Sequence, residues 1–484
     1  MKTMSPPRPR TRLAIAVMAL FALSGCATFS SDGGFGAVEQ TVKDRLGKEV
    51  KWARSDADRD TIDERVARLL KQPLSVEDAV QIALLNNKGL QASFSELGIS
   101  EADRVQAGRL PNPGFSFGRL TQGSSVEIDR SIQFNLARLL MLPMVSEIES
   151  RRFEQTRGAV ALGVLSLASE TRKAYYVAVA ADETGRYMLQ VQTAAEAGAE
   201  LARRQAQAGN WNKLQQAREQ SFYADAALNL ARAERARGAA RERLTRLLGL
   251  WGQQALLRLP ERLPDLPNLP NPAPNDLRDI EQTAMAQRMD VQAARLGTEQ
   301  LAKNLGLTRA TRFINVLEVG AVRNSRPVDG NATTQRGYTI SLELPLFDWG
   351  GARVAKAEAI YMQAVNRTAQ TAINARSEVR EAYAGYRSSY DIARHFRDEI
   401  VPLKKRISQE NQLRYNGMLI GVFELLADAR SQITSVNGYI DALRDFWLAQ
   451  ADLDMALIGN PAGTPGMTAM PAAMSRVDIG AAAH

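Results

Sequence analysis

The chain contains two copies of one pattern, and this duplication limits its fold more strongly than any other feature of its 484 residues. Many identical residues recur at a spacing of 208 positions. These pairs are Glu170 and Glu378, Arg172 and Arg380, Ala174 and Ala382, Tyr175 and Tyr383, Leu136 and Leu344, and Gly209 and Gly417. The spacing changes little along the chain, to 201 between Ala83 and Ala284 and to 210 between Gly249 and Gly459. A register that holds over so long a span indicates a duplicated domain.

A proline-rich stretch separates the two copies. Residues 258–276, RLPERLPDLPNLPNPAPND, contain six prolines. Because proline fixes φ and lacks an amide hydrogen, we expect an extended connector that is neither helix nor inner strand. The first repeat is then expected over residues 74–257 and the second over residues 277–459. The tail at 460–484 is rich in Pro, Gly and Ala and is expected to be disordered.

Each repeat contains a segment in which apolar and polar side chains alternate. In residues 126–136 the apolar set is Val126, Ile128, Ile132, Phe134 and Leu136, and the polar set is Glu127, Asp129, Ser131, Gln133 and Asn135. Residues 338–344 alternate in the same way, with Glu343 in the polar set. Since successive side chains of a strand point to opposite faces, both segments predict strands with one apolar and one polar wall, and Arg130 is the exception. Shorter strands are predicted around Phe115 and Leu317, which gives four strands per chain.

Long alanine-rich helices are predicted after the second strand of each repeat. They cover roughly residues 147–206 and 352–415, and each is followed by a turn at a glycine and a further helix that ends near residue 250 or 458. About 60 helical residues would extend ~90 Å, so we expect these helices to pack along one another as coiled coils. Four strands cannot close a transmembrane barrel, for which about eight are needed. A soluble antiparallel sheet with one face on a core explains the alternation equally well.

The first 25 residues have the features of an export signal. Basic residues between Lys2 and Arg12 precede an 11-residue apolar run, Leu13–Leu23, which is too short to cross a bilayer as a helix. The tetrapeptide LSGC at 23–26 resembles the lipobox of bacterial lipoproteins. That resemblance implies that Cys26 is lipidated as the first mature residue, and that residues 26–73 form a lipid-anchored N-terminal segment.

Composition argues against several functional classes. Removing the signal takes away four basic residues, so the formal net charge falls from +8 to +4 and nucleic-acid binding is not indicated. With one cysteine and two histidines, His395 and His484, no His/Cys cluster can form a zinc or iron site within one chain. No HExxH motif and no phosphate-binding glycine loop occur in the sequence. We therefore expect neither an enzyme nor a cofactor.

Four motifs, in this order of helices and strands, resemble the TolC-type outer-membrane efflux channel family. They are ALLNNKGLQA (83–92), GRLPNPGFSFG (108–118), LELPLFDWGGARVAKAEA (342–359) and RYNGMLIGVFELLADAR (414–430). The resemblance extends from about Leu74 to Gly459. It implies a mixed α/β membrane protein in which three chains share one twelve-stranded outer-membrane β-barrel, four strands each. A long α-helical coiled-coil tunnel continues the barrel through the periplasm.

The resemblance also implies a function and partners. The chain would be the outer-membrane lipoprotein of a tripartite efflux system, a passive homotrimeric conduit that exports small molecules or metal ions. Its partners would be a periplasmic adaptor (membrane fusion) protein, an inner-membrane efflux pump and outer-membrane lipid. The exported substrate and the identity of the pump and adaptor stay open. The alternative is a non-channel periplasmic coiled-coil lipoprotein with a structural or adaptor role.

Candidate site residues follow from the resemblance. Glu127, Asp129 and Glu343 would face the water-filled lumen of the barrel. Acidic residues near the helix turns close the periplasmic end in this family, which implies a gate and selectivity role for Glu424 and Asp428. Ala427 occupies the place of a second family acid, and the first repeat has Gln215 where the second has Glu424. The turns at Gly209 and Gly417 would contact the adaptor.

Overall fold

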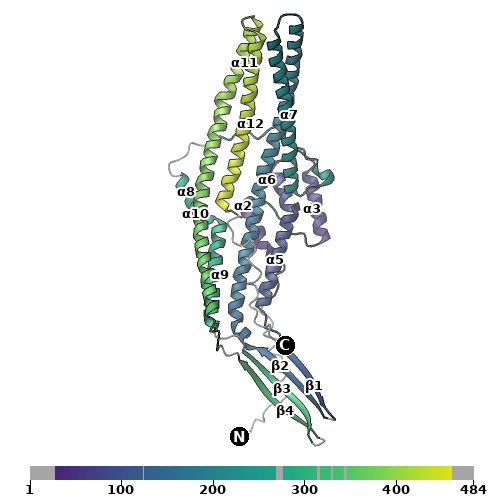
Figure 1. Ribbon diagram of the computed structural model, residues 1–484, viewed down its shortest axis with the longest axis vertical. Helices are drawn as coiled ribbons and strands as arrows, with labels where there is room; N and C mark the ends of the chain where they lie inside the picture. Colours follow the sequence, from purple (N-terminus) through teal and green to yellow (C-terminus); the bar gives the residue numbers. More distant parts are fainter. Residues whose placement is uncertain are drawn as a thin grey trace, which may run out of the picture.

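The computed structural model describes residues 28–123, 125–268, 276–312, 317–328, 331–342 and 346–460. They form an elongated molecule in which a bundle of long helices ends at a four-stranded sheet (Figure 1). The expected signal at 1–25, Cys26, Glu343 and residues 461–484 lie outside this part of the chain. None of the helices within these ranges is both long enough and apolar enough to cross a membrane.

The sheet combines strands from both repeats. Strands β1 (Gly114–Gln122), β2 (Ser125–Asn135), β3 (Leu317–Val328) and β4 (Asn331–Leu342) pair antiparallel in chain order. β2 of the first repeat pairs with β3 of the second. β1 and β3, which the sequence predicted as shorter strands around Phe115 and Leu317, are 9 and 12 residues long. β1 and β4 are the free edges of the sheet within one chain.

The helices recur in the same order in both halves. The first half contains α4 (Val76–Asn86), α5 (Lys88–Ala107), α6 (Leu136–Gln207) and α7 (Lys213–Leu248). The second half contains α8 (Asp276–Gln287), α9 (Met289–Thr311), α10 (Gly351–His395), α11 (Val401–Asn416) and α12 (Val422–Ile458). α6 packs against α7, and α10 and α11 pack against α12. This repetition is the structural counterpart of the duplicated sequence.

Two details of the long helices differ from the sequence prediction. α6 begins at Leu136, eleven residues before the expected start, because the Asn135 side chain caps it by accepting a 2.8 Å hydrogen bond from the amide of Arg138. Pro143 is accommodated inside this helix. In the second half a π-helical turn, Phe396–Ile400, separates α10 from α11 and ends two residues before Pro402. A π turn is the wider helical form in which the missing amide hydrogen of proline can be tolerated.

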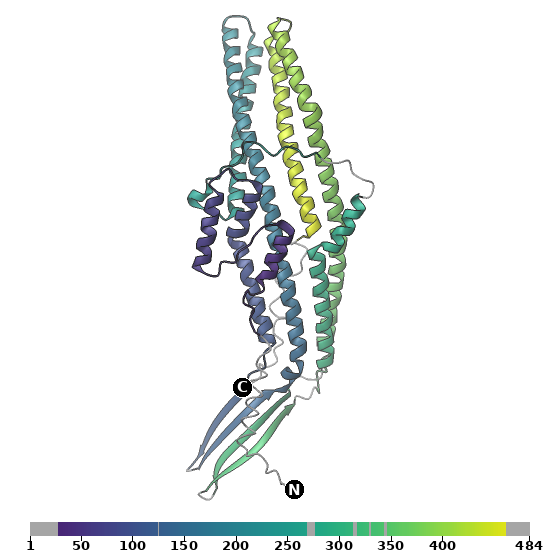
Figure 2. The same ribbon diagram turned by 180° about the vertical axis from the view of Figure 1, so that it is seen from behind.

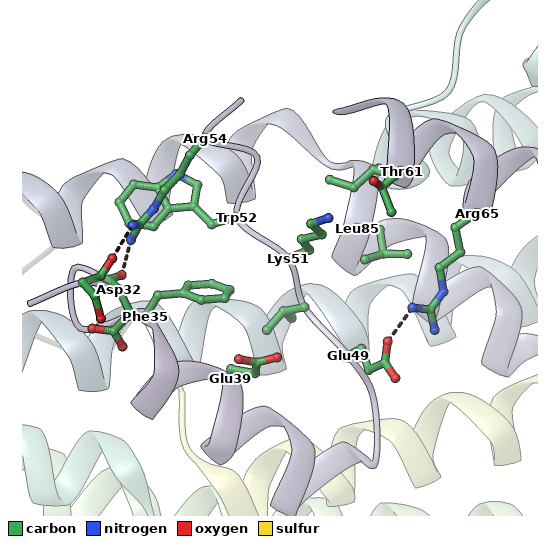
Figure 3. Close-up of a pocket in the computed structure, with 13 residues that line it drawn as sticks. Asp32, Phe35, Glu39, Glu49, Lys51, Trp52, Arg54, Thr61, Arg65 and Leu85 are labelled. Atoms are coloured by element: carbon green, nitrogen blue, oxygen red, sulfur yellow. Dashed lines mark hydrogen bonds and ion pairs between the residues drawn. The ribbon is translucent and has the colours of Figure 1, made fainter. Parts of the chain in front are cut away.

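The N-terminal segment wraps the middle of the bundle. Helices α2 (Phe35–Leu46) and α3 (Asp56–Leu69) lie with α4 and α5 beside α6, halfway along the molecule (Figure 2). Phe94 is fully buried there and packs edge-on against Phe35. Between α2 and α3 lies a hollow of about 500 Å³, in which the Arg54 guanidinium covers the Trp52 ring at 4.0 Å (Figure 3).

The described part of the connector contacts both halves of the chain. Leu263 and Leu266 are buried, and the Leu263 amide donates a 3.1 Å hydrogen bond to Glu183 of α6. From the other half, the Trp447 indole of α12 donates to the Pro264 carbonyl at 3.1 Å. The connector, which its prolines were expected to keep extended, therefore links α6 to α12.

In each half, the bend between the two short helices holds the end of a long one. In the first half, Asn86 donates hydrogen bonds to the carbonyls of Leu248 (3.1 Å) and Gly249 (2.8 Å) at the end of α7. In the second half, the Arg288 guanidinium donates to the Ala456 carbonyl at 2.9 Å near the end of α12.

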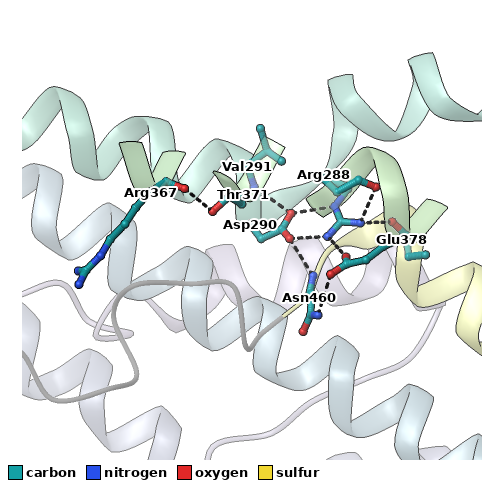
Figure 4. A network of polar contacts seen from close by, with 9 residues as sticks. Arg288, Asp290, Val291, Arg367, Thr371, Glu378 and Asn460 are labelled. Atoms are coloured by element: carbon teal, nitrogen blue, oxygen red, sulfur yellow. Dashed lines mark hydrogen bonds and ion pairs between the residues drawn. The ribbon is translucent and has the colours of Figure 1, made fainter. Parts of the chain in front are cut away.

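Arg288 is at the centre of a buried ionic network. It is 1% exposed and also contacts the carboxylates of Asp290 (2.6 Å) and Glu378 (2.7 Å), while the Asn460 amide donates to Asp290 at 3.0 Å (Figure 4). Burial lowers the pKa of Arg288, but the hydrogen bonds and charges of the two carboxylates outweigh it and raise that pKa above its ordinary value. The charged side chains of Arg288, Asp290 and Glu378 thus form with one another the interactions that water would otherwise provide.

Candidate functional site

The two faces of the sheet differ in polarity. We call the face that carries Phe115 the apolar face, because the strand register places large apolar side chains from all four strands on it. Its members include Phe115, Phe117, Ile128, Ile132, Phe134, Val319, Tyr338, Ile340 and Leu342. Many of these side chains are exposed. Within one chain, none of the described helices or strands packs a core against the apolar face, which argues against the soluble-sheet interpretation.

The opposite face, which we call the polar face, carries the predicted lumen residues. Glu127 and Asp129 lie on it, and Glu127 accepts a 2.6 Å ion-pair contact from Arg326 of β3. Oδ1 of Asp129 is buried and has no hydrogen-bond partner among the described residues. The structure thus brings Glu127 and Asp129 to one face, as the alternation predicted. Glu343, the third predicted member, lies outside the described residues.

The far end of the molecule consists of two helix turns. The turn between α6 and α7 and the turn between α11 and α12 lie close together at the tip (Figure 1). Glu424 is exposed in the first turn of α12, where the helix dipole favours a negative charge. Asp428 lies one turn further along and is half-buried, and its Oδ2 has no hydrogen-bond partner in the part of the chain that the structure describes.

The two tip turns superpose with a spacing of 209 rather than 208. The amide of Asn210 donates to the Gln205 carbonyl, and the amide of Leu419 donates to the Arg414 carbonyl in the same way. Gly209 therefore corresponds to Met418, and both have positive φ, 77° and 60°. Gly417, paired with Gly209 by sequence identity, has φ −80°. The second turn thus places a non-glycine residue in a left-handed conformation.

An ion pair that the sequence did not suggest joins the two halves near the tip. Glu219 of α7 is 1% exposed and accepts a 2.7 Å hydrogen bond from Arg430 of α12. The Arg430 guanidinium also covers the Phe222 ring at 4.3 Å. At a spacing of 209, Glu219 is the counterpart of Asp428, and Ser221 is the counterpart of Arg430. Gln215 and Glu424, already matched in the sequence, have the same spacing of 209.

A second buried ion pair holds α6 to α7. Asp182 is 2% exposed and contacts Arg237 at 3.0 Å and Arg241 at 2.5 Å. Burial pushes the pKa of Asp182 upward, but the hydrogen bonds and charges of Arg241 and Arg237 outweigh it and hold that pKa below its ordinary value. Within the described ranges, His, Cys, Asp and Glu side chains form no group of three or more that could hold a metal ion.

Comparisons with known proteins agree with this geometry. Residues 281–445 match the family described as outer membrane efflux protein. The cobalt-zinc-cadmium resistance protein CzcC of Cupriavidus metallidurans is 24% identical over 287 residues, which are 57% of this chain and 64% of that relative. The matched region thus spans less than two thirds of the relative's length.

Solved structures share the fold. The CmeC outer membrane channel of Campylobacter jejuni has a TM-score of 0.66 at 17% identity, over 85% of this chain and 89% of that chain. CusC has a TM-score of 0.63 at 18% identity, over 81% of this chain and 94% of that chain.

These matches confirm the predicted fold, with long helices and four antiparallel strands in one chain. The matched family is described as outer membrane efflux protein, and both solved structures are described as membrane channels. Residues 281–445 thus match the outer membrane efflux protein family, and the chain has the fold of the solved channels CusC and CmeC.

Proposed function

We propose that three copies of this chain form a passive export duct, and the open sheet is the observation that carries this proposal. β1 and β4 leave unpaired backbone groups at both edges of a sheet whose apolar face is uncovered. Inside a membrane such groups have no water to bind, so an open sheet must be closed by pairing with further strands. Three copies supply twelve strands, and the polar face then lines a water-filled lumen.

The duct works as part of a tripartite system with a periplasmic adaptor protein and an inner-membrane pump, which supplies the energy. The tip turns around Gly209 and Gly417 are the proposed adaptor contacts. The side chains of Met418 and Leu419 support this assignment, because they are 94% and 77% exposed at the end of a periplasmic helix hairpin. Exposed apolar groups of this kind mark a surface for another protein.

Lipidation of Cys26 anchors the N-terminal segment to the outer membrane in this proposal. The described part of that segment, from residue 28 on, packs against α5 and α6 halfway along the bundle. One acylated end then tethers the periplasmic part without occupying the sheet.

The periplasmic gate consists of Glu424, Asp428 and the Glu219–Arg430 ion pair. Within one chain, Glu219 of α7 and Arg430 of α12 fasten the two helix hairpins together. In a closed ring, α12 also meets α7 of the next copy, and Asp428 then faces Ser221 of the partner subunit. At this contact between copies a serine stands where the contact within one copy has Arg430. The contact between copies therefore lacks the ion pair, and we expect the tip to open between copies.

Divalent metal cations are the proposed cargo. The relative from Cupriavidus metallidurans is named for resistance to cobalt, zinc and cadmium. Carboxylates at the lumen and at the tip, Glu127, Asp129, Glu424 and Asp428, favour cations over anions by their charge. Deleting the gene from its host should lower the Co²⁺, Zn²⁺ and Cd²⁺ concentrations that stop growth, and unchanged tolerance with increased drug sensitivity would assign the duct to organic cargo instead.

Conductance in a planar lipid bilayer tests the duct itself. The purified mature protein should produce discrete current steps that favour cations. A folded and membrane-inserted protein without any conductance would contradict the duct and favour the alternative, a non-channel coiled-coil lipoprotein.

A further inference from the structure

Four arginines lie on the apolar face of the sheet. The strand register places Arg130 of β2, Arg323 of β3 and Arg336 of β4 directly opposite one another, in line with Phe117 of β1. Arg119 lies on the same face, two residues beyond Phe117 toward the β1–β2 turn. We call Arg130, Arg323 and Arg336 the arginine row.

The arginine row has no counter-charge in the described strands. Their acidic residues, Glu127, Asp129 and Glu318, all lie on the polar face, and the fifth strand arginine, Arg326, pairs with Glu127 there. None of the row's three guanidinium groups forms a hydrogen bond or ion pair with another described residue. Like charges placed directly opposite on neighbouring strands repel each other, so three arginines in one row favour the binding of an external anion.

The position of the row along the strands indicates which anion. From Leu342, next to the helices, to Arg336 the chain runs six residues, or about 20 Å of extended strand. Over that length the same face carries Phe115, Ile132 and Ile340. At a tilt of 35–45° this length rises about 15 Å, more than half of the ~25 Å apolar band of an outer-membrane barrel. The row therefore lies in the half of that band away from the periplasmic helices, where arginine side chains extend toward the lipid headgroups.

We propose that the arginine row binds the phosphate groups of a phosphorylated glycolipid in the outer leaflet. Guanidinium groups bind phosphate oxygens through paired, charge-assisted hydrogen bonds. The apolar residues beside the row contact the acyl chains of the same lipid, which free phosphate does not offer, and this continuity of charged and apolar surface favours a lipid as occupant. In the trimer the row recurs on each copy and forms a belt around the barrel. This inference rests on the proposed barrel.

A binding measurement on the purified, conducting protein tests this proposal. Diphosphorylated lipid A in detergent is the probe, and binding is followed by native mass spectrometry and by the thermal midpoint. We expect the wild type to bind lipid A, and a triple variant with Arg130→Gln, Arg323→Gln and Arg336→Gln to bind it at least about tenfold more weakly, since each lost contact involves a charged hydrogen bond. Arg326→Gln, on the polar face, is the matched control and should bind as the wild type does.

Two further arms separate the possible anions. Lipid A from which both phosphates have been removed should bind the wild type weakly, and inorganic phosphate alone should not raise the thermal midpoint. Equal binding by the triple variant, equal binding of dephosphorylated lipid A, or a full effect of inorganic phosphate would each overturn the proposal. If the triple variant does not fold, Arg323→Gln, at the centre of the row, replaces it. Because conductance is recorded on the same samples, a conducting protein that fails to bind lipid A contradicts this inference and leaves the duct intact.

Discussion

Gly249 lies so close to Asn86 that a Cβ at residue 249 would be 2.8 Å from the Asn86 carbonyl oxygen. Gly249 ends α7 with a φ of 66°, and its own carbonyl accepts a hydrogen bond from the Asn86 side chain at 2.8 Å. The absence of a side chain thus serves two purposes, a left-handed helix end and a close approach of two backbones.

Gly249→Ala should therefore lower the stability of the protein more than a left-handed glycine alone explains. Gly47 is the matched control, because it ends α2 with a φ of 62° and has nothing within 4 Å of an added Cβ. We expect Gly47→Ala to cost about 1 kcal/mol from backbone strain and Gly249→Ala to cost about 3 kcal/mol or more, since its Cβ also clashes. Thermal midpoints measured in one detergent compare them, and equal shifts would show that the close approach does not matter.

Replacing Asp182 should change how stability depends on pH. Since the folded-state pKa of Asp182 lies below its ordinary value, its ion pairs with Arg237 and Arg241 stabilise the protein above about pH 4. That contribution disappears as the pH falls through the lowered pKa. We expect Asp182→Asn to lower the thermal midpoint at pH 7 and to flatten the acid side of the stability curve below about pH 4.

Asp56→Asn is the control for this experiment, because the Asp56 side chain is 92% exposed in its surface ion pair with Arg59. It should leave the midpoint nearly unchanged. An Asp182→Asn variant with the acid dependence of the wild type would show that the buried pair contributes nothing to acid unfolding.

Glu424→Gln should reduce the preference of the channel for cations. A carboxylate at a narrow pore attracts cations and repels anions, so we expect the cation-to-anion permeability ratio to fall about twofold or more. The reversal potential in a salt gradient measures this ratio. Glu64→Gln, which removes the same charge from the exposed surface of α3, should leave it unchanged. If both variants behave alike, Glu424 has no role in selectivity.

Paired cysteines test which helices meet at the tip. A short bismaleimide cross-linker should join Glu219→Cys to Arg430→Cys within one chain and leave its mobility under denaturing conditions that of one chain, because two long side chains span a gap that a disulfide does not bridge. Asp428→Cys with Ser221→Cys should instead link copies and produce dimers and trimers on the same gel. Chains with only one of the new cysteines are the controls. Efficient formation of dimers by the Glu219–Arg430 pair, or no dimers with the Asp428–Ser221 pair, would contradict the proposed contacts within and between copies.

The alternation of residues 126–136 was sufficient to predict both faces of β2, because the side-chain period of a strand is a local property. The repeated pattern likewise indicated long paired helices. The start of α6 was predicted too late, because sequence reasoning gave no weight to the cap at Asn135. Helix ends depend on one or two hydrogen bonds and are the least predictable feature of such elements.

The buried ion pairs could not be predicted, because their members are far apart in the chain. Glu219 and Arg430 are 211 residues apart, and Arg288 and Glu378 are 90 apart. In the sequence, charged residues such as Glu219 on an alanine-rich helix are expected to lie on its solvated surface. Glu219 loses its water only where α7 meets α12, and Arg288 only where the residue before α9 meets α10 and the end of α12.

The mass of the detergent-extracted mature protein tests most directly whether several copies close the sheet. Native mass spectrometry should give the mass of three chains, and strand edges β1 and β4 should be protected from hydrogen exchange in that particle. A single chain that stays soluble after removal of detergent and of the Cys26 acyl group, with Phe115 and Ile340 packed inside it, would contradict the account.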